Sequence, residues 1–143
     1  MLSLFVSDVP LSCINSVAYE YHIPAKLIIS VLNIERGKVG LISKNNNTSY
    51  DIGPMQINSI WLVNLKRYGI TQHDLQYDPC INVRVGTWIL SKAIANGSNF
   101  LRGVGDYHSH TPVNNSSYNQ KVRINFRKIQ ILLRDSDKDG RNI

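Results

Sequence analysis

The sequence predicts a mainly α fold in a single domain. Apolar residues recur at helical spacing in several segments, and no convincing run of residues shows the alternation that is typical of strands. Polar or Gly/Pro-containing stretches separate these segments. The chain has 143 residues, of which 43% are hydrophobic, so it is long enough for one core and too short for two.

The first two expected helices lie near the N-terminus. Residues 11–22 form a short helical pattern, and Pro24 stands where the first turn of a second helix tolerates a missing N–H group. In this second helix Val31 and Glu35 share one face, and Gly37 is expected to end the helix. Glu35 therefore continues an apolar stripe.

The segment that follows is polar and irregular. Its Asn- and Ser-rich run at residues 45–49 predicts a turn or a small β-hairpin within residues 40–53, where any β-structure is expected. Asp78 precedes a proline and is placed to cap a long helix. Helical patterns are present in four segments after the irregular one: residues 59–67, 79–95, 100–107 and 118–133.

The two ends of the chain fit this domain less well. Residues 1–10 are apolar in places but contain no Lys or Arg and are interrupted by Asp8 and Pro10, so they do not make a complete signal peptide. We expect residues 1–10 to be an N-terminal extension or the remnant of an export segment. We expect residues 11–133 to be the domain and residues 134–143 to be a flexible polar tail.

The net charge of +6, from 16 Lys and Arg against 10 Asp and Glu, favours a polyanionic partner. Nucleic acid, a phospholipid surface and an acidic cell-wall polymer all fit this charge. The basic residues are spread along the chain and match no nucleic-acid motif, so no nucleic-acid partner is expected. The apolar runs are too short to span a bilayer, and a monomer is expected.

The chain has two cysteines, Cys13 and Cys80, which lack the spacing and the histidine partners of a zinc site. We expect one long-range disulfide, which would imply an oxidising compartment such as the bacterial periplasm; two buried thiols are the alternative. No metal is expected elsewhere. The His108 and His110 pair lacks an acidic or Cys partner, and the acidic run at residues 135–140 lacks the closing glutamate of a calcium loop.

Two carboxyl groups have the opposite settings that glycosidase chemistry requires. A carboxyl group held against apolar side chains has its charged form disfavoured, as a general acid needs, and Glu35 has this setting. Asp51 follows the polar stretch and is expected to stay ionised. This pair matches the acid and the charge-stabilising carboxylate of glycosidases. The alternative for Glu35 is a capped or salt-bridged structural residue.

The motifs around these carboxyl groups resemble those of specialised lytic transglycosylases, which accompany type III and type IV secretion, conjugation and pilus machines. The first motif is residues 35–40, ERGKVG, and the second is residues 50–58, YDIGPMQIN. The resemblance covers residues 11–125. Further matching blocks are Trp61–Leu62, Tyr68–Ile70, Asp78–Val83, Gly86, Trp88–Leu90, Gly103–Ser109, Thr111–Pro112 and Asn114.

This resemblance implies a lysozyme-like, goose-type helical domain in which Glu35 is the catalytic acid. Asp51 also matches the second catalytic carboxylate of animal-type lysozymes, which the same segment resembles. Arg36 stands where many family members have Ser, and His108 stands where many have Asn. The resemblance implies these substrate-binding residues: Tyr50, Gly53, Met55, Gln56, Asn58, Tyr107 and His108.

The implied activity is cleavage of the β-1,4 bond between N-acetylmuramic acid and N-acetylglucosamine in peptidoglycan, with an anhydro-muramic product. Glu35 acts as acid and then as base, Asp51 stabilises charge or orients the substrate, and no cofactor is required. A hydrolytic muramidase that uses Glu35 and Asp51 is one alternative, and a non-catalytic peptidoglycan-binding module is another. The expected location is the periplasm, with components of a secretion, conjugation or pilus apparatus as further partners.

Overall fold

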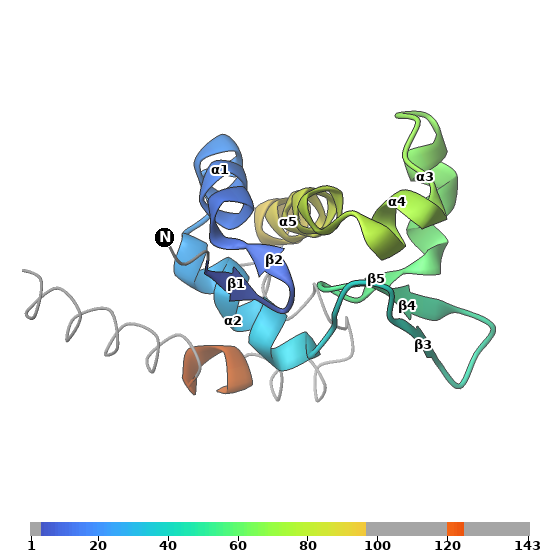
Figure 1. Ribbon diagram of the computed structural model, residues 1–143, viewed down its shortest axis with the longest axis horizontal. Helices are drawn as coiled ribbons and strands as arrows, with labels where there is room; N and C mark the ends of the chain where they lie inside the picture. The colour runs from blue at the N-terminus through green and yellow to red at the C-terminus, as the bar shows by residue number, and fades with distance from the viewer. Residues whose placement is uncertain (1–3, 97–119, 125–143) are drawn as a thin grey trace, which may run out of the picture.

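The structure is a computed structural model that describes residues 4–96 and 120–124 (Figure 1). Most of the described residues are helical and two small antiparallel sheets accompany them, which confirms the mainly α class. Residues 120–124 are helical, as expected within the last predicted helix, and Val122 is buried. The other predictions for the C-terminal part lie outside the described residues: the helix at 100–107, the rest of the helix at 118–133, the His108 and His110 pair, and the tail.

The described chain begins with a β-hairpin that no sequence pattern indicated. Strands β1 (Phe5–Val6) and β2 (Val9–Pro10) pair antiparallel through a two-residue turn. The turn residues Ser7 and Asp8 have φ angles of 51° and 67°. Positive φ at both positions matches the right-handed twist of the two strands, but Asn-Gly is the usual sequence for it. This hairpin lies within the ten residues expected to be an extension.

Helices α1 (Leu11–Tyr21) and α2 (Ala25–Glu35) follow the predicted boundaries closely. The end of α2 differs from the expectation in one respect. Arg36, not Gly37, adopts the left-handed conformation that ends the helix, with a φ of 56°, and its N–H donates to the Leu32 carbonyl oxygen at 3.1 Å. Gly37 is required for a different reason: a side chain at this position would clash with the backbone of Gly53 and Pro54.

The predicted β-structure is present and extends further than expected. Strands β3 (Ile42–Lys44), β4 (Tyr50–Ile52) and β5 (Ile57–Asn58) form one antiparallel sheet with β4 in the middle. The Asn- and Ser-rich run forms the turn between β3 and β4, as predicted. In this register Asp51 lies opposite Ser43 on one side and opposite Asn58 on the other.

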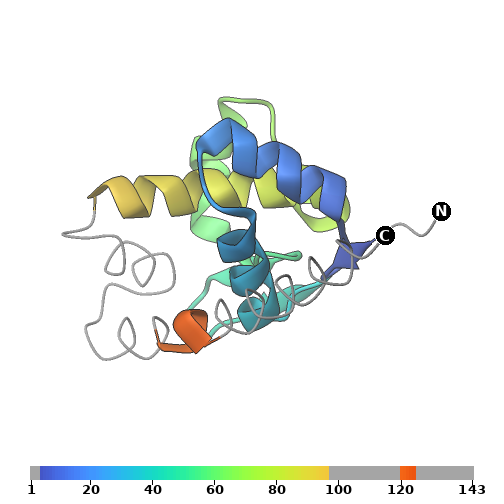
Figure 2. The same cartoon turned by 90° about the vertical axis from the view of Figure 1, so that its left-hand side faces the viewer.

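The remaining helices surround a long central one. A 3-10 helix, η1 (Ser59–Trp61), leads into α3 (Leu62–Lys66), and α5 (Pro79–Asn96) crosses the molecule between α1 on one side and α4 (Gln72–Tyr77) on the other (Figures 1 and 2). Helix α4 was not predicted. Within the described ranges, none of these helices combines the length and apolar composition that a membrane span needs.

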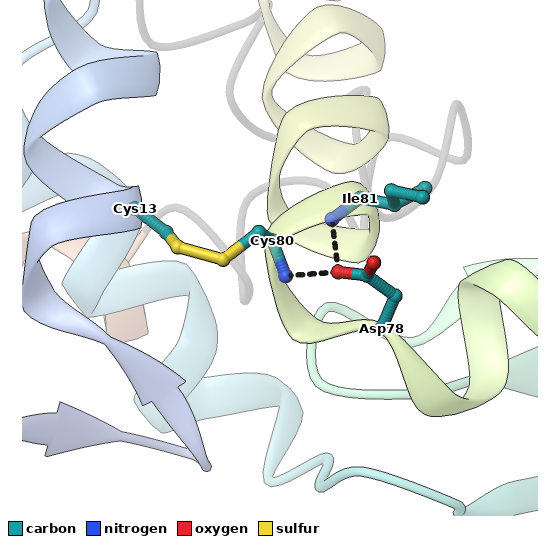
Figure 3. Close-up of a disulfide and its surroundings, with 4 residues drawn as sticks. All are labelled: Cys13, Asp78, Cys80 and Ile81. Carbon is teal, nitrogen blue, oxygen red and sulfur yellow. Dashed lines mark hydrogen bonds between the residues drawn. A yellow bond between two sulfur atoms is a disulfide. The ribbon is translucent and has the colours of Figure 1, made fainter.

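Cys13 and Cys80 form a disulfide that joins α1 to the first turn of α5, with 5.5 Å between their Cα atoms (Figure 3). Beside it, Asp78 Oδ1 accepts hydrogen bonds from the backbone N–H groups of Cys80 and Ile81, both at 3.0 Å. This confirms Asp78 as the cap predicted for the long helix. The start of α5 is therefore held both by a local cap and by a covalent link to α1.

Candidate active site

Glu35 and Asp51 line the same cleft, of about 260 Å³, at the junction of α2 with the three-stranded sheet. Glu35 is the last residue of α2 and Asp51 is the middle residue of β4. Both side chains are half-buried. Three amide side chains and three apolar side chains complete the described part of the lining: Asn45, Gln56, Asn58, Ile57, Trp61 and Ile89.

The chain that follows Glu35 packs directly against the turn that follows Asp51. A Cβ atom on Gly37 would lie 2.2 Å from the Gly53 carbonyl oxygen and 2.4 Å from the Pro54 carbonyl oxygen. Real Cβ atoms essentially never approach so closely, so only glycine fits at this position. The close backbone contact brings the end of α2 to the edge of the sheet.

Asn82, a fully buried residue of α5, forms a hydrogen bond with the turn at residues 53–56. Its Oδ1 accepts a hydrogen bond from the Met55 N–H at 2.9 Å. Its Nδ2 donates to the carbonyl oxygens of Ile52 at 3.0 Å and Leu75 at 2.9 Å. One side chain therefore provides partners for three buried backbone groups, which belong to the turn, to the end of β4 and to α4.

Asp51 lies in the polar setting that the sequence predicted. Asn58, directly opposite on β5, donates from Nδ2 to Asp51 Oδ1 and to Ser49 Oγ, both at 3.1 Å. A carboxylate that accepts a hydrogen bond from a neighbouring strand has a defined orientation, because the sheet fixes the position of the donor. Asp51 therefore presents its carboxyl group to the cleft from a rigid element.

Gln56 and Asn58 bring amide groups to the cleft. Gln56 has a φ of 52°, and its backbone N–H and its Nε2 both donate to the Gly53 carbonyl oxygen at 3.0 Å. This internal bond fixes the side chain beside the cleft. Amide groups can donate to and accept from the hydroxyl and acetamido groups of a sugar, so the arrangement suits a polar, uncharged ligand.

An aromatic pair supports one wall of the cleft. The rings of Trp61 and Trp88 meet edge to face, with 5.7 Å between their centroids and 74° between their planes. The Nζ atom of Lys92 lies 4.6 Å from the centroid of Trp88, within the range of a cation–π contact. Trp61 therefore presents a braced apolar surface to the cleft, the kind of surface on which the apolar face of a sugar ring can pack.

Residues 12–127 match the family described as the transglycosylase SLT domain. The match covers most of the chain. The chain belongs to the transglycosylase SLT domain family. This is a family of lytic transglycosylases whose substrate is peptidoglycan, and its domain is lysozyme-like and mainly helical, which agrees with the fold described above.

Individual relatives of this SLT domain come from enteric bacteria. Invasion protein IagB of Salmonella typhimurium (strain SL1344) is 35% identical over 115 residues, which are 77% of this chain and 72% of the relative. The peptidoglycan-binding-like protein of Escherichia coli O157:H7 is 30% identical over 125 residues, 82% of this chain and 72% of the relative. Protein IpgF of Shigella flexneri is 28% identical over 100 residues, 69% and 66% of the two chains.

The predicted site residues of the SLT domain fall into three groups. Glu35, Asp51, Gln56 and Asn58 come together at the cleft. A second group is described by the structure but is not part of the cleft lining. Tyr107 and His108, with the rest of residues 97–119, lie outside the described part of the chain.

The second group comprises Tyr50, Gly53 and Met55, and each has a structural role. The Tyr50 hydroxyl group donates to Gln72 Oε1 at 2.5 Å, which links the sheet to α4. Gly53 is buried with a φ of 71°, and a Cβ atom there would lie 2.3 Å from Asn82 Nδ2. Met55 is fully buried and packs against Gly86 of α5, so its side chain belongs to the core and offers no surface to a ligand.

Four described cleft residues were not predicted as site residues: Asn45, Ile57, Trp61 and Ile89. Trp61 had a usable signal, because it lies three residues after Asn58 in one of the blocks that carry the family resemblance. Ile89 also lies in such a block, Trp88–Leu90, but it is at least 28 residues from the other lining residues, and the packing of α5 brings it to the cleft.

No group of three or more His, Cys, Asp or Glu side chains in the described ranges is placed to hold a metal ion.

Two groups away from the cleft have shifted pKa values. Burial, assisted by the Glu20 charge and opposed by Arg84, raises the pKa of Tyr21. The backbone hydrogen bond from Thr71 lowers the pKa of Asp74.

Proposed function

We propose that this SLT domain cleaves the β-1,4 bond between N-acetylmuramic acid and N-acetylglucosamine and leaves anhydro-muramic ends. The observation that carries this proposal is the presence of Glu35 and Asp51 in the lining of one cleft, together with the amide groups of Gln56 and Asn58. Two carboxyl groups on either side of a bound sugar are the arrangement that glycoside cleavage uses. The matched family supplies the substrate class.

In the proposed mechanism Glu35 first donates its proton to the glycosidic oxygen. The bond between this oxygen and the anomeric carbon of N-acetylmuramic acid breaks, and positive charge develops on that carbon. Glu35, now a carboxylate, takes the proton of the C6 hydroxyl group of the same sugar. The C6 oxygen then bonds to the anomeric carbon, which closes the anhydro ring and returns Glu35 to its protonated form.

Asp51 stabilises the transition state in this mechanism without forming a bond. Its carboxylate is held by Asn58 on the neighbouring strand, so it is oriented before the substrate binds. A fixed negative charge near the anomeric carbon opposes the developing positive charge. The acetamido group of the same sugar can also be oriented by this carboxylate.

A hydrolytic muramidase is the second candidate, and the position of Asp51 is the observation that favours it. The carboxylate lies on the same cleft as Glu35, as the second carboxylate of a hydrolase must. In this case water, not the C6 hydroxyl group, attacks the anomeric carbon. The products then have hydrated reducing ends.

We propose that the enzyme acts in the periplasm and opens the wall locally for a secretion or conjugation apparatus. Three observations support this role. One relative is named an invasion protein, another is named a peptidoglycan-binding-like protein, and the disulfide between Cys13 and Cys80 fits an oxidising compartment. A domain that only binds peptidoglycan is the remaining alternative, but it would not need a carboxyl group at the position of Glu35.

The deciding experiment is the digestion of purified sacculi in water enriched in heavy oxygen. Mass spectrometry of the soluble fragments should show unlabelled anhydro ends, each lighter than a reducing end by one water. Labelled reducing ends would instead identify a muramidase, and the absence of soluble fragments would identify a binding module. Glu35→Gln is the matched control, because it keeps the shape of the side chain and removes the exchangeable acid.

A further inference from the structure

The turn of the β1–β2 hairpin contacts the backbone on both sides of Glu35. Ser7 Oγ donates to the Leu32 carbonyl oxygen at 3.3 Å, and Asp8 Oδ2 accepts from the Val39 N–H at 3.2 Å. Leu32 precedes Glu35 by three residues, and Val39 follows it by four. Two consecutive side chains of one turn therefore hold the segment from which Glu35 projects.

This segment needs support because α2 ends at Glu35. The last carbonyl groups of a helix lack partners within the helix, and the last turn tends to open. Here Arg36 already has a left-handed backbone, and its N–H donates to the Leu32 carbonyl oxygen. Ser7 gives that oxygen a second donor, and Asp8 holds the chain after the helix has ended.

The hairpin is a firm base for these contacts. Val9 is fully buried, and the Leu11 N–H donates to the Leu4 carbonyl oxygen at 2.9 Å, which closes the base of the hairpin onto the start of α1. Strand β1 contacts α2, while β2 contacts α1 and α5 (Figure 1). The turn thus connects the end of α2 to the core of the domain.

The turn residues themselves are unusual for their conformation. Both Ser7 and Asp8 have positive φ, which residues other than Gly adopt uncommonly and which Asn and Asp tolerate better than Ser does. Such a conformation persists where surrounding contacts impose it, and it is frequent at functional sites. Within the described residues, these two side chains form hydrogen bonds with α2 and with the segment after it.

We propose that Ser7 and Asp8 are positioning residues for Glu35. They fix the last turn of α2 and the chain after it, so that the carboxyl group reaches the glycosidic oxygen in the geometry needed for proton transfer. A small displacement of a catalytic group is enough to lower a rate strongly. The proposal rests on the proposed catalytic role of Glu35.

The test compares two substitutions at Asp8 that differ in one property. Asp8→Gly favours the positive φ of the turn but removes the acceptor, whereas Asp8→Asn tolerates the same φ and keeps an acceptor oxygen. We expect Asp8→Gly to lower kcat on soluble glycan strands by about three- to tenfold, as the loss of one hydrogen bond would. KM should change less than twofold and the unfolding temperature should not fall. Asp8→Asn should retain the wild-type kcat.

Amide hydrogen exchange supplies a readout that does not depend on activity. The Val39 amide should exchange faster in Asp8→Gly than in the wild type, while the amides of α1 should not change. Glu20→Gln is the charge control, because Glu20 is an exposed carboxylate on α1 that pairs with Arg84 and its removal changes the net charge equally. It should leave kcat unchanged.

Four outcomes would overturn the positioning role. They are a wild-type kcat in Asp8→Gly, a loss of kcat that follows an equal loss of stability, an equal loss in Asp8→Asn, and unchanged exchange at Val39. Glu35→Gln in the same assay separates this failure from that of the proposed function. If Glu35→Gln is inactive and Asp8→Gly is fully active, only the positioning role fails. If Glu35→Gln remains active, both proposals fail.

Discussion

Gly37 lies against Gly53 so closely that a Cβ atom on Gly37 would be 2.2 Å from the Gly53 carbonyl oxygen. Gly37 follows Glu35 by two residues, and Gly53 follows Asp51 by two residues. One backbone contact therefore joins the two segments that carry the carboxyl groups of the cleft. The motif that ends α2 and the motif that contains β4 are two halves of one packing arrangement.

Gly37→Ala should disrupt the packing of the segment after α2 against the turn after β4. The added methyl group would meet backbone atoms that cannot move away easily, so we expect a loss of about 1 to 3 kcal/mol in the free energy of unfolding. Activity should fall further than this loss explains, because the distance between Glu35 and Asp51 changes. Denaturant unfolding would measure the loss of stability. Activity measured well below the unfolding temperature would show the additional loss of catalysis.

Gly69→Ala is the control for this prediction. Gly69 has a φ of 73° but open space where a Cβ atom would stand. The substitution should therefore cost about 1 kcal/mol through backbone strain and leave the activity of the folded enzyme intact. Full activity in Gly37→Ala would contradict the proposed role of the contact.

Asn82→Leu should destabilise the domain by at least about 3 kcal/mol, because it leaves three buried backbone groups without their side-chain partner. The substitution keeps a similar volume, so the loss reports the hydrogen bonds and not a cavity. Asn64→Leu, at an exposed position of α3, is the control and should change stability little. A comparable unfolding free energy in the two variants would show that Asn82 is dispensable.

The two carboxyl groups should differ in their importance. Glu35→Gln should reduce peptidoglycan cleavage to background with folding retained, because the amide can neither donate nor accept the proton. Asp51→Asn should keep residual activity, because the substrate itself delivers the attacking hydroxyl group. Release of soluble fragments from sacculi, with circular dichroism to verify folding, measures both. If Asp51→Asn is as inactive as Glu35→Gln, Asp51 is a full catalytic partner and the muramidase gains support.

Removal of the disulfide by Cys13→Ser with Cys80→Ser should lower the free energy of unfolding by about 2 to 5 kcal/mol. The bond closes a loop across a sequence separation of 67 and joins α1 to α5, two elements that pack together in the core. Activity at low temperature should persist, because neither cysteine lines the cleft. Chemical unfolding of the double variant against the oxidised wild type is the measurement, and equal midpoints would refute the prediction.

Asp74 should make part of the stability dependent on pH. Its Oδ2 accepts the Thr71 N–H at 2.9 Å in the folded state, and this bond lowers its pKa below the ordinary value of 3.8. A lowered pKa means that the stabilisation is present above the ordinary value and is lost as the pH falls through the folded-state value. Asp74→Asn should therefore be less stable than the wild type at pH 6 and approach it below pH 3 or so. A difference that does not depend on pH would contradict this assignment.

Much of the fold could be predicted because its determinants are local. Pro24 and the helical spacing of apolar residues define α2, Asp78 caps α5 through the N–H groups of the next turn, and the polar run at residues 45–49 makes the turn between β3 and β4. Each of these features depends on residues within a few positions of one another. Local preferences of this kind act whatever the rest of the chain does.

Helix α4 could have been predicted but was not. Thr71 and Asp74 form a capping box, in which each side chain bonds to the backbone of the other residue. In the usual sequence of this motif, Glu or Gln stands three residues after the capping residue. Here that position is Asp74, which makes the pattern less evident. The helix is also only six residues long, so no apolar periodicity could develop in it.

By itself the sequence determined the mainly α class, the order of the long helices, the pair of candidate carboxyl groups and the two cysteines that join. Only the tertiary structure decided that Met55 belongs to the core while Trp61 and Ile89 reach the cleft, and that Ser7 and Asp8 hold the end of α2. The reason is physical. Helical periodicity and capping act between residues close in sequence, whereas the burial of a side chain and the φ of a strained turn depend on which distant segments pack against it.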